Sequence, residues 1–511
     1  MVERLKGSTV ARLTFGLTAS ILVSFLASQN SCLAKITLSG IFKDHMVIQQ
    51  EAPVRIFGKA EPKEILGVKL GPENKVVVFA DEKGNFTAEL KPMKAGGPYK
   101  LTVVGSEKIE VDDILAGEVW LLSGQSNMEL SCKESKLEDK IAELKFQPNV
   151  RFITLPPRVS SEKETVVDAT WQTLDNDSAS EVSAIATFFA QRVSQETQVP
   201  VGIIVSAVAN SPIQPWISKE CLESYPDGRS LIKKTEKLVE ELKAKGVDPR
   251  NLPVKKAEKG DGQPVNADES EKMASSPYTV FNSMINPLVP FSIKGVVWYQ
   301  GEADVYESDD YYGKMTRMIK DWRSQWKLPH LPFIYAQLPA VGNRQTQPAD
   351  ESPFAVLRDA QARANVVPYS YMAVTLDCSP VKNPDWHSAN KVKIANRLAE
   401  IALATQYNKP YPYKSPSPFT FDLDENKVVI HFKNTLKNLK AENDKLEGFA
   451  ISGMDKKLVW ANAKIEGDSV IVWSDKVDKP IFVKYAWADN PKGNLKGGGN
   501  LPAVPFLLEL E

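Results

Sequence analysis

Cysteine and histidine are scarce in this chain of 511 residues, with four of each. The cysteines, at positions 32, 132, 221 and 378, are too few and too scattered for a disulfide framework. No Cys-x-x-Cys or His-x-x-x-His spacing occurs, so no metal site is expected. Neither charge dominates, because 63 Lys and Arg nearly balance 64 Asp and Glu, and a nucleic-acid partner is therefore not expected.

Long apolar runs are also missing, except near the start of the chain. Three basic residues precede an apolar stretch, Leu13–Ala27, and small residues lead on to Ala34. This pattern predicts a cleaved secretory signal peptide over residues 1–34, and hence a periplasmic or extracellular protein with no stable membrane insertion. A lipoprotein anchor through Cys32 is less favoured, because polar residues precede it where small apolar ones are usual.

The rest of the chain divides by its hydrophobic pattern into three segments. Residues 35–112 and 411–511 show short alternating runs between Gly and Pro turns, which predicts an N-terminal and a C-terminal β-rich domain. Residues 113–410 alternate apolar runs with helical segments, which predicts an α/β domain with a mainly parallel sheet. Its expected strands are Val119–Leu122, Val201–Val205, Gly295–Tyr299, Phe333–Gln337 and Met372–Leu376.

A polar insertion interrupts the α/β domain at about residues 226–276. Its first half predicts one amphipathic helix, with Leu231, Thr235, Leu238 and Leu242 on one face. Its second half is rich in charge and glycine and predicts a surface loop, which either forms a lid or has no role.

Ser126 follows the strand Val119–Leu122, at the carboxyl edge of the sheet where open α/β folds place their active sites. A serine hydroxyl needs a base and an orienting acid to become a nucleophile. Of the four histidines, His45, His330 and His431 lie in β segments or a connector, which leaves His387.

His387 stands in Asp385-Trp386-His387, after the last expected strand and before the helix 391–403. An aspartate two residues before a histidine in an extended turn can point to the same side, so Asp385 is the candidate orienting acid. The alternative is a local one, in which Asp385 caps the next helix and His387 fills the turn.

Donors for an oxyanion are expected from two further strand ends. Gln300 could offer its side-chain amide, and the stretch 206–211, which includes Asn210, could add another donor beside the backbone N–H of Ser126. Glu302 is interpreted as a buried carboxylate that shapes its loop. Because the second glycine of Gly-x-Ser-x-Gly is absent around Ser126, the common α/β-hydrolase fold is disfavoured.

These residues resemble the sialate O-acetylesterase-like family of SGNH hydrolases. Residues 117–128, which contain Gln125, Ser126 and Asn127, resemble its nucleophile block, and residues 295–302 and 385–391 resemble two later blocks. Flanking stretches match as well, among them 357–361 with Arg358, so that the similarity covers nearly all of residues 36–505.

The resemblance implies a flavodoxin-like sheet and a carboxylic ester hydrolase that acts on an acetylated carbohydrate without metal or organic cofactor. It assigns Ser126 as nucleophile, His387 as base, Asp385 as orienting acid and Gln300 as oxyanion donor. Gln125, Asn127, Glu302 and Arg358 are expected to support the site. It leaves the acetylated sugar and the oligomeric state unspecified.

Two departures from the family pattern affect what the site is expected to do. Ala209-Asn210-Ser211 replaces the usual Gly-Gly-Thr or Gly-Gly-Ser turn, and Ser388 replaces a usual proline. A side chain at position 210 could narrow the pocket or move a backbone donor. The departure at Asn210 favours one alternative, a non-catalytic or degenerate carbohydrate-binding protein. A second alternative is a glycosidase that uses Glu302 and a second carboxylate.

Overall fold

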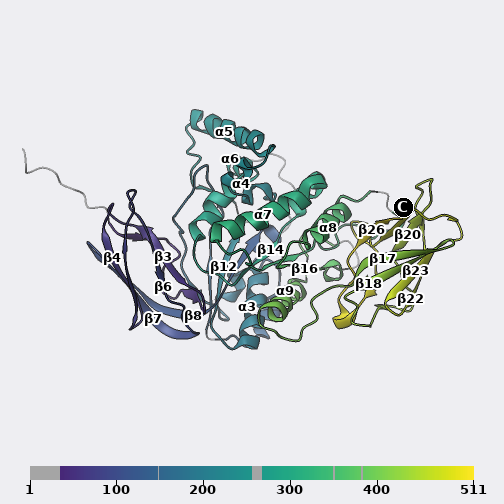
Figure 1. Cartoon of the computed structure of the whole chain (residues 1–511), viewed down its shortest axis with the longest axis horizontal. Coiled ribbons are helices and arrows are strands. Elements are labelled where there is room, and N and C mark those ends of the chain that lie inside the picture. The colour runs from purple at the N-terminus through teal and green to yellow at the C-terminus, as the bar shows by residue number, and fades with distance from the viewer. Residues whose placement is uncertain are drawn as a thin grey trace, which may run out of the picture.

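The computed structural model describes residues 35–147, 149–255, 268–348, 351–380, 384–388 and 390–510. Figure 1 shows three parts in a row: a β-rich N-terminal part, a central part in which helices flank a sheet, and a β-rich C-terminal part. The expected signal peptide, residues 1–34, and much of the expected surface loop, residues 256–267, lie outside the described residues. Among the residues described, no helix is long and apolar enough to span a bilayer.

The N-terminal part is built from strands with alternating buried and exposed side chains, as sheets with one solvated face require. One antiparallel sheet consists of β1 (Thr37–Leu38), β3 (Val54–Lys59) and β6 (Asn85–Leu90). The other strands are β2 (Val47–Gln49), β4 (Ile65–Leu70), β5 (Asn74–Phe79), β7 (Gly96–Val104) and β8 (Lys108–Gly124). β8 pairs with β7 and continues into the central sheet, so the boundary expected at residues 112/113 falls inside one strand.

Six neighbouring strands of the central sheet are parallel, and most of their residues are buried, which fits a sheet covered on both faces. Their order is β9 (Val150–Thr154), β12 (Val201–Ala207), β8, β14 (Gly295–Tyr299), β15 (Phe333–Ala336) and β16 (Ser370–Ala373). β11 (Gln172–Thr173) pairs antiparallel with β9 at one edge. The prediction of an α/β fold with β-rich segments is therefore confirmed.

The two faces of the central sheet have separate hydrophobic cores, because alternate residues of a strand point to opposite sides. Trp120 and Leu122 of β8 belong to the core beneath α3 (Ala184–Thr197) and α9 (Lys391–Gln406). Val119 and Leu121 belong to the core beneath α7 (Tyr311–Trp326) and α8 (Pro353–Ala364). The shorter helices of this part are α1 (Ser126–Glu129), α2 (Glu138–Ala142), α4 (Lys219–Glu223), η1 (Ala179–Glu181), η2 (Gln214–Trp216), η3 (Phe281–Ile285), η4 (Asn286–Leu288), η5 (Glu302–Asp310) and η6 (Leu376–Cys378).

The polar insertion contains α5 (Gly228–Ala244) and α6 (Glu269–Ala274), which project from the upper side of the central part in Figure 1. α5 is amphipathic, and it buries Ile232, Thr235 and Leu242. Leu231 and Leu238 are only half-buried, so the buried face is rotated slightly from the one read in the sequence. A short pair of strands, β10 (Arg158–Val159) and β13 (Leu252–Pro253), ties the insertion to the domain.

The C-terminal part consists of two four-stranded antiparallel sheets that pack face to face around one apolar core. One sheet has β17 (Ser417–Asp424), β18 (Lys427–Lys433), β23 (Ser469–Trp473) and β22 (Asn462–Glu466). The other has β21 (Val459–Trp460), β20 (Phe449–Ser452), β24 (Phe482–Tyr485) and β26 (Phe506–Glu509). β19 (Lys440–Ala441) pairs with β25 (Leu495–Lys496), which η7 (Gly498–Asn500) follows.

Candidate active site

Ser126 and His387 meet at the carboxyl end of the central strands. Ser126 begins α1 directly after β8, and His387 lies in the loop between η6 and α9. His387 Nε2 lies 3.0 Å from Ser126 Oγ. This distance permits direct proton transfer between the two groups. The structure thus joins two of the three residues that the sequence predicts to be catalytic.

The turn after β8 depends on Gly124 and Gln125. Gly124 has φ +144°, and a Cβ at this position would lie 2.0 Å from the carbonyl oxygen of Tyr299. Only glycine permits this close approach to β14. The side-chain Oε1 of Gln125 accepts hydrogen bonds from the backbone N–H groups of Gly301 (3.2 Å) and Ala303 (3.3 Å). Gln125 therefore ties the turn to the start of η5.

Asn127 is fully buried and links the turn to the loop that carries His387. Its Nδ2 donates to the carbonyl oxygen of Trp386 (3.0 Å) and to Glu302 Oε1 (2.5 Å). The Nζ of Lys391 donates to the carbonyl oxygen of Asn127 (3.1 Å) and to its Oδ1. Because Trp386 directly precedes His387, these bonds hold the loop that carries His387 against the turn that carries Ser126.

Glu302 is buried beside Asn127, with 5% of its surface exposed. Burial raises the pKa of this carboxyl, while the hydrogen bond from Asn127 and the charge of Lys391 act in the opposite direction. The Lys391 ammonium lies 5.2 Å from the ring centroid of Tyr299, so it is enclosed by the end of β14. Glu302 and Lys391 thus contact the two ends of the Asn127 side-chain amide in the buried interior.

Gln300 is fully buried, and its side-chain amide is bonded within its own surroundings. Nε2 donates to the carbonyl oxygen of Ser211 (3.1 Å) and to Asp304 Oδ2 (2.6 Å), and Oε1 accepts from the Tyr311 hydroxyl (2.9 Å). Both hydrogens of Nε2 therefore have acceptors other than a bound ester. An oxyanion contact from Gln300, as the sequence predicts, would require one of these bonds to be exchanged.

Asp304 was not anticipated from the sequence, although it stands two residues after Glu302. Its Oδ2 accepts from the N–H of Ile213 (2.8 Å) as well as from Gln300. Burial raises the pKa of Asp304 to about 6. Asp304 thus fastens the end of β14 to the turn after β12.

That turn contains Asn210 at the position where the resemblance leads one to expect glycine. Asn210 is exposed and has φ +54°, in the left-handed region that asparagine adopts more readily than most residues with a side chain. Ser211 is buried, and its Oγ donates to the Val208 carbonyl (2.7 Å) and accepts from Trp216 Nε1 (2.9 Å). The glycine-like backbone is therefore kept, while an additional side chain stands on the surface of the turn.

Asp385 is exposed, and its Oδ1 accepts from the backbone N–H of Trp386 (2.7 Å). Trp386 packs edge-to-face against Phe354 of α8, with 5.1 Å between the ring centroids. Asn390, and not Asp385, caps α9, because its side chain accepts from the N–H of Lys393. The alternative in which Asp385 caps this helix is thereby wrong, and its role as orienting acid stays a prediction.

Arg358 lies between the central and C-terminal parts. Its guanidinium is fully buried and donates to four carbonyl oxygens, those of Leu338 (2.9 Å), Pro339 (2.5 Å), Ala488 (2.6 Å) and Asp489 (2.8 Å). Burial lowers the pKa of Arg358 to about 9. Its contacts fasten α8 and the segment after β15 to the 486–491 loop of the C-terminal part.

The three cysteines among the described residues offer no alternative nucleophile. Cys132, Cys221 and Cys378 are free thiols, and burial raises the pKa of each to about 12. A thiol with such a pKa is protonated at neutral pH and unreactive. Across the ranges that the structure describes, no group of three or more His, Cys, Asp and Glu side chains is arranged to hold a metal ion.

Known proteins are similar to this chain in sequence and in fold. Residues 116–247 and 270–404 match the family described as "Carbohydrate esterase, sialic acid-specific acetylesterase". Human sialate O-acetylesterase is 27% identical over 512 residues, which cover 90% of each chain, and the mouse enzyme is 25% identical over 91% of this chain and 93% of its own. The crystal structure of a carbohydrate acetylesterase from Xanthomonas citri superposes with a TM-score of 0.78 and 29% identity, covering 93% of this chain and all of the other.

The fold, the Ser126–His387 contact and these similarities together define a carboxylic ester hydrolase. More particularly, the chain belongs to the sialic acid-specific acetylesterase family of carbohydrate esterases, since the family match covers more than half of its length.

Proposed function

We propose that this protein is a serine esterase that removes O-acetyl groups from a carbohydrate through an acetyl-enzyme. The observation that carries the proposal is the 3.0 Å contact between His387 Nε2 and Ser126 Oγ. In the first step, His387 accepts the hydroxyl proton while Ser126 Oγ bonds to the acetyl carbonyl carbon. The sugar hydroxyl leaves with that proton, and water then hydrolyses the acetyl-enzyme with His387 again acting as base.

The negative oxygen of the tetrahedral intermediate needs donors that are in place before the reaction. Ser126 begins α1, so its backbone N–H belongs to the first turn, where N–H groups have no partner within the helix. The turn at Asn210 lies after β12, the strand next to β8, and supplies the second group of candidate donors. In this proposal Gln300 holds the Ser211 carbonyl and thereby fixes the turn.

Asp385 is proposed as the acid that orients the imidazole of His387. Its position two residues before His387, in the same extended loop, supports this role. Glu302 is also linked to this loop, since Asn127 bonds both to Glu302 and to the Trp386 carbonyl, but Glu302 is buried and accepts a hydrogen bond from Asn127. We therefore assign Glu302 to the support of the loop.

The order of the strands supports an SGNH-type, flavodoxin-like arrangement of the central sheet. With β9 set aside, the strands numbered in chain order run 2-1-3-4-5, from β12 through β8, β14 and β15 to β16. This is the order of flavodoxin-like folds, in which ligands bind at the carboxyl ends of the strands where the order reverses. Ser126 lies at that point, after β8.

Acetate release tests the proposal. Wild-type protein should release acetate from p-nitrophenyl acetate and from acetylated glycans, and Ser126→Ala should lower kcat by at least ~1,000-fold. Ser469→Ala is a matched control, because Ser469 also contacts a histidine, in the C-terminal sheet. Equal acetate release by wild type and Ser126→Ala would refute the proposal. A panel of acetylated sialosides, xylans and pectins identifies the sugar.

Export by the N-terminal segment is a separate proposal, based on the pattern of residues 1–34. It predicts that the mature protein isolated from its source begins near residue 35. Sequencing of that N-terminus tests it, and an intact N-terminus would contradict it.

A further inference from the structure

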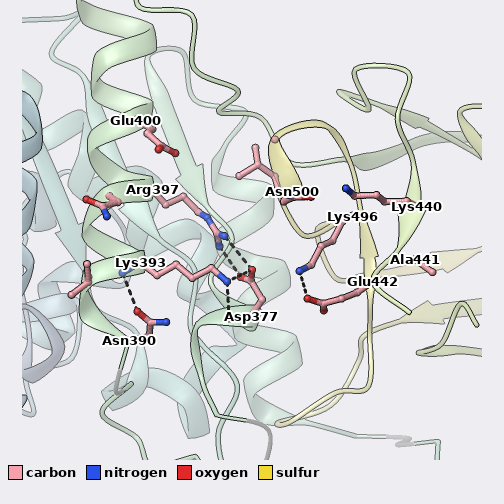
Figure 2. Close-up of a pocket in the computed structure, with 14 residues that line it drawn as sticks. Asp377, Asn390, Lys393, Arg397, Glu400, Lys440, Ala441, Glu442, Lys496 and Asn500 are labelled. Atoms are coloured by element: carbon pink, nitrogen blue, oxygen red, sulfur yellow. Dashed lines mark hydrogen bonds and ion pairs between the residues drawn. The ribbon is translucent and has the colours of Figure 1, made fainter. Parts of the chain in front are cut away.

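A cavity of about 730 Å³ lies between α9 and the C-terminal part, apart from the Ser126–His387 contact. Figure 2 shows Lys393 and Arg397 reaching from α9 toward Asp377, while Lys440 and Lys496 come from the opposite, C-terminal side. Cavities of several hundred Å³ at the junction of two domains are frequent ligand sites. The position and size of this cavity therefore fit a bound molecule.

The cavity begins close to the loop that carries His387. Asn390 lines the cavity. Because Asn390 is three residues after His387, their Cα atoms are at most about 11 Å apart. Ser388 donates a hydrogen bond to the carbonyl oxygen of Cys378 (2.9 Å), beside the cavity residue Asp377. A glycan whose acetylated unit lies at Ser126 could thus extend over this loop into the cavity.

The chemistry of the lining suits a sugar. Its residues offer amides, carboxylates and cationic groups, with few apolar side chains among them: Asp377, Asn390, Val392, Lys393, Asn396, Arg397, Glu400, Lys440, Ala441, Glu442, Lys496, Gly499, Asn500 and Leu501. Sugar hydroxyls both donate and accept hydrogen bonds, so they need donors and acceptors together. A lining of this kind disfavours an apolar ligand.

The charges of the lining indicate one acidic group on that sugar. Four cationic side chains face three carboxylates, so one positive charge is in excess. Asp377 pairs with Lys393 (2.7 Å) and Arg397 (2.8 Å), and Glu442 pairs with Lys496 (2.5 Å). Lys440 is exposed and forms no ion pair within the described ranges. Its ammonium is therefore available to a ligand carboxylate.

We propose that this cavity is an accessory subsite for a carboxylated sugar unit, a uronate or a sialate. Lys440 pairs with the sugar carboxylate, and the amides of Asn396 and Asn500 bind hydroxyl groups. This proposal depends on the proposed esterase function in one respect: the neighbouring unit of the same glycan carries the acetyl group that is removed at Ser126.

Binding measurements on the Ser126→Ala protein test the subsite without turnover. Two pairs of probes differ in charge: trigalacturonate with its neutral methyl ester, and sialyllactose with lactose. In isothermal titration calorimetry, the acidic member of at least one pair should bind at least ~5-fold more tightly than its neutral partner, and the pair that responds identifies the sugar. Lys440→Ala should remove that preference, whereas Lys445→Ala, an exposed lysine outside the cavity, should keep it.

Equal binding of acidic and neutral probes, absence of binding to all four, or an unchanged preference in Lys440→Ala would overturn the subsite. Kinetics separate this result from the esterase proposal, because Lys440→Ala should keep kcat/KM on p-nitrophenyl acetate and lower it ~5-fold on an acetylated acidic oligosaccharide. A wild-type protein that prefers the acidic probe but releases no acetate would refute the esterase proposal and still support the subsite.

Discussion

A serine contacts a histidine in two regions of this molecule. In the central part, Ser126 Oγ lies 3.0 Å from His387 Nε2. In the C-terminal sheet, Ser469 Oγ lies 2.8 Å from His431 Nδ1, and His431 Nε2 lies 2.7 Å from Asp422 Oδ2. The second group thus has the three residue types of a Ser-His-Asp triad, joined by hydrogen bonds from serine to histidine to aspartate.

The surroundings of the two groups differ. His431 and Ser469 face each other across the antiparallel strands β18 and β23, where polar cross-strand pairs stabilise the sheet, and the side chain of Asp422 is 75% exposed. Ser126 is buried at the end of a parallel strand and begins a helix whose first N–H groups can serve an oxyanion. Ser469 is the first residue of β23, whereas Ser126 follows the carboxyl end of β8 and begins α1. The comparison teaches that residue types alone do not distinguish the two groups, and that the surroundings of Ser126 are what support its proposed catalytic role.

The largest expected difference between the two groups comes from removing each histidine. His387→Ala should lower kcat on p-nitrophenyl acetate by at least ~1,000-fold, because in the proposed mechanism His387 is the general base for the Ser126 hydroxyl. His431→Ala should change kcat less than ~2-fold. Steady-state kinetics on both variants measure this, with circular dichroism as a check of folding. A large loss of kcat in folded His431→Ala would place chemistry in the C-terminal sheet and break the comparison.

A second difference concerns the glycine two residues before each serine. Gly124→Ala would force a Cβ to 2.0 Å from the carbonyl of Tyr299, so the turn must move and kcat should fall ~100-fold or more, together with Tm. Gly467 has φ +62° and open space around it, so Gly467→Ala should cost only about 1 kcal/mol and leave kcat unchanged. Thermal unfolding and kinetics on the pair separate these effects. A fully active Gly124→Ala protein would show that the turn tolerates displacement.

The third difference is the support that Asn127 gives to the catalytic loop. Asn127→Ala removes the bond to the Trp386 carbonyl and should lower kcat ~10- to 100-fold with little change in KM, because His387 is displaced from Ser126. Lys391→Met should act in the same direction, and Lys391→Arg should restore part of the activity. Lys320→Met, at an exposed position on α7, is the control on p-nitrophenyl acetate. Normal kcat in Asn127→Ala would remove Asn127 from this positioning role.

Much of this architecture could be predicted because hydrophobic runs buried on both faces mark parallel strands. The end of one such run predicts the position of Ser126 at the carboxyl edge of the sheet. Because the chain has only four histidines, elimination points to His387 as the partner of Ser126. The bonding of Gln300 and Asp304 could not be predicted, because it depends on the directions of side chains from separate loops. The sequence also does not show that β8 belongs to both the N-terminal and the central part. Asp112-Asp113 interrupts the apolar pattern there, although the strand continues through these two residues.

A smaller effect is expected from the acids beside each histidine. Asp385→Asn should lower kcat about 10-fold if Asp385 orients the imidazole of His387, and the effect is modest because Asp385 is exposed. Asp422→Asn should leave kcat unchanged. Glu302→Gln should keep most of the activity. The opposite pattern, with activity lost in Glu302→Gln and kept in Asp385→Asn, would identify Glu302 as the orienting acid.

The smallest effect concerns stability and not rate. Burial raises the pKa of Asp304 to about 6, above its ordinary value of 3.8, so ionisation of this carboxyl costs the folded state more than the unfolded one. Its contribution to the free energy of unfolding is therefore most favourable below about pH 4, falls by up to about 3 kcal/mol between pH 4 and 6, and stays constant above about pH 6.

The variant Asp304→Asn tests this dependence, because its side chain keeps an acceptor for Gln300 and Ile213 but cannot ionise. Urea unfolding of both proteins at pH 4 to 7 should show the variant gaining stability relative to wild type as pH rises. A constant difference across this range would mean that Asp304 ionises as readily in the folded protein as in the unfolded chain.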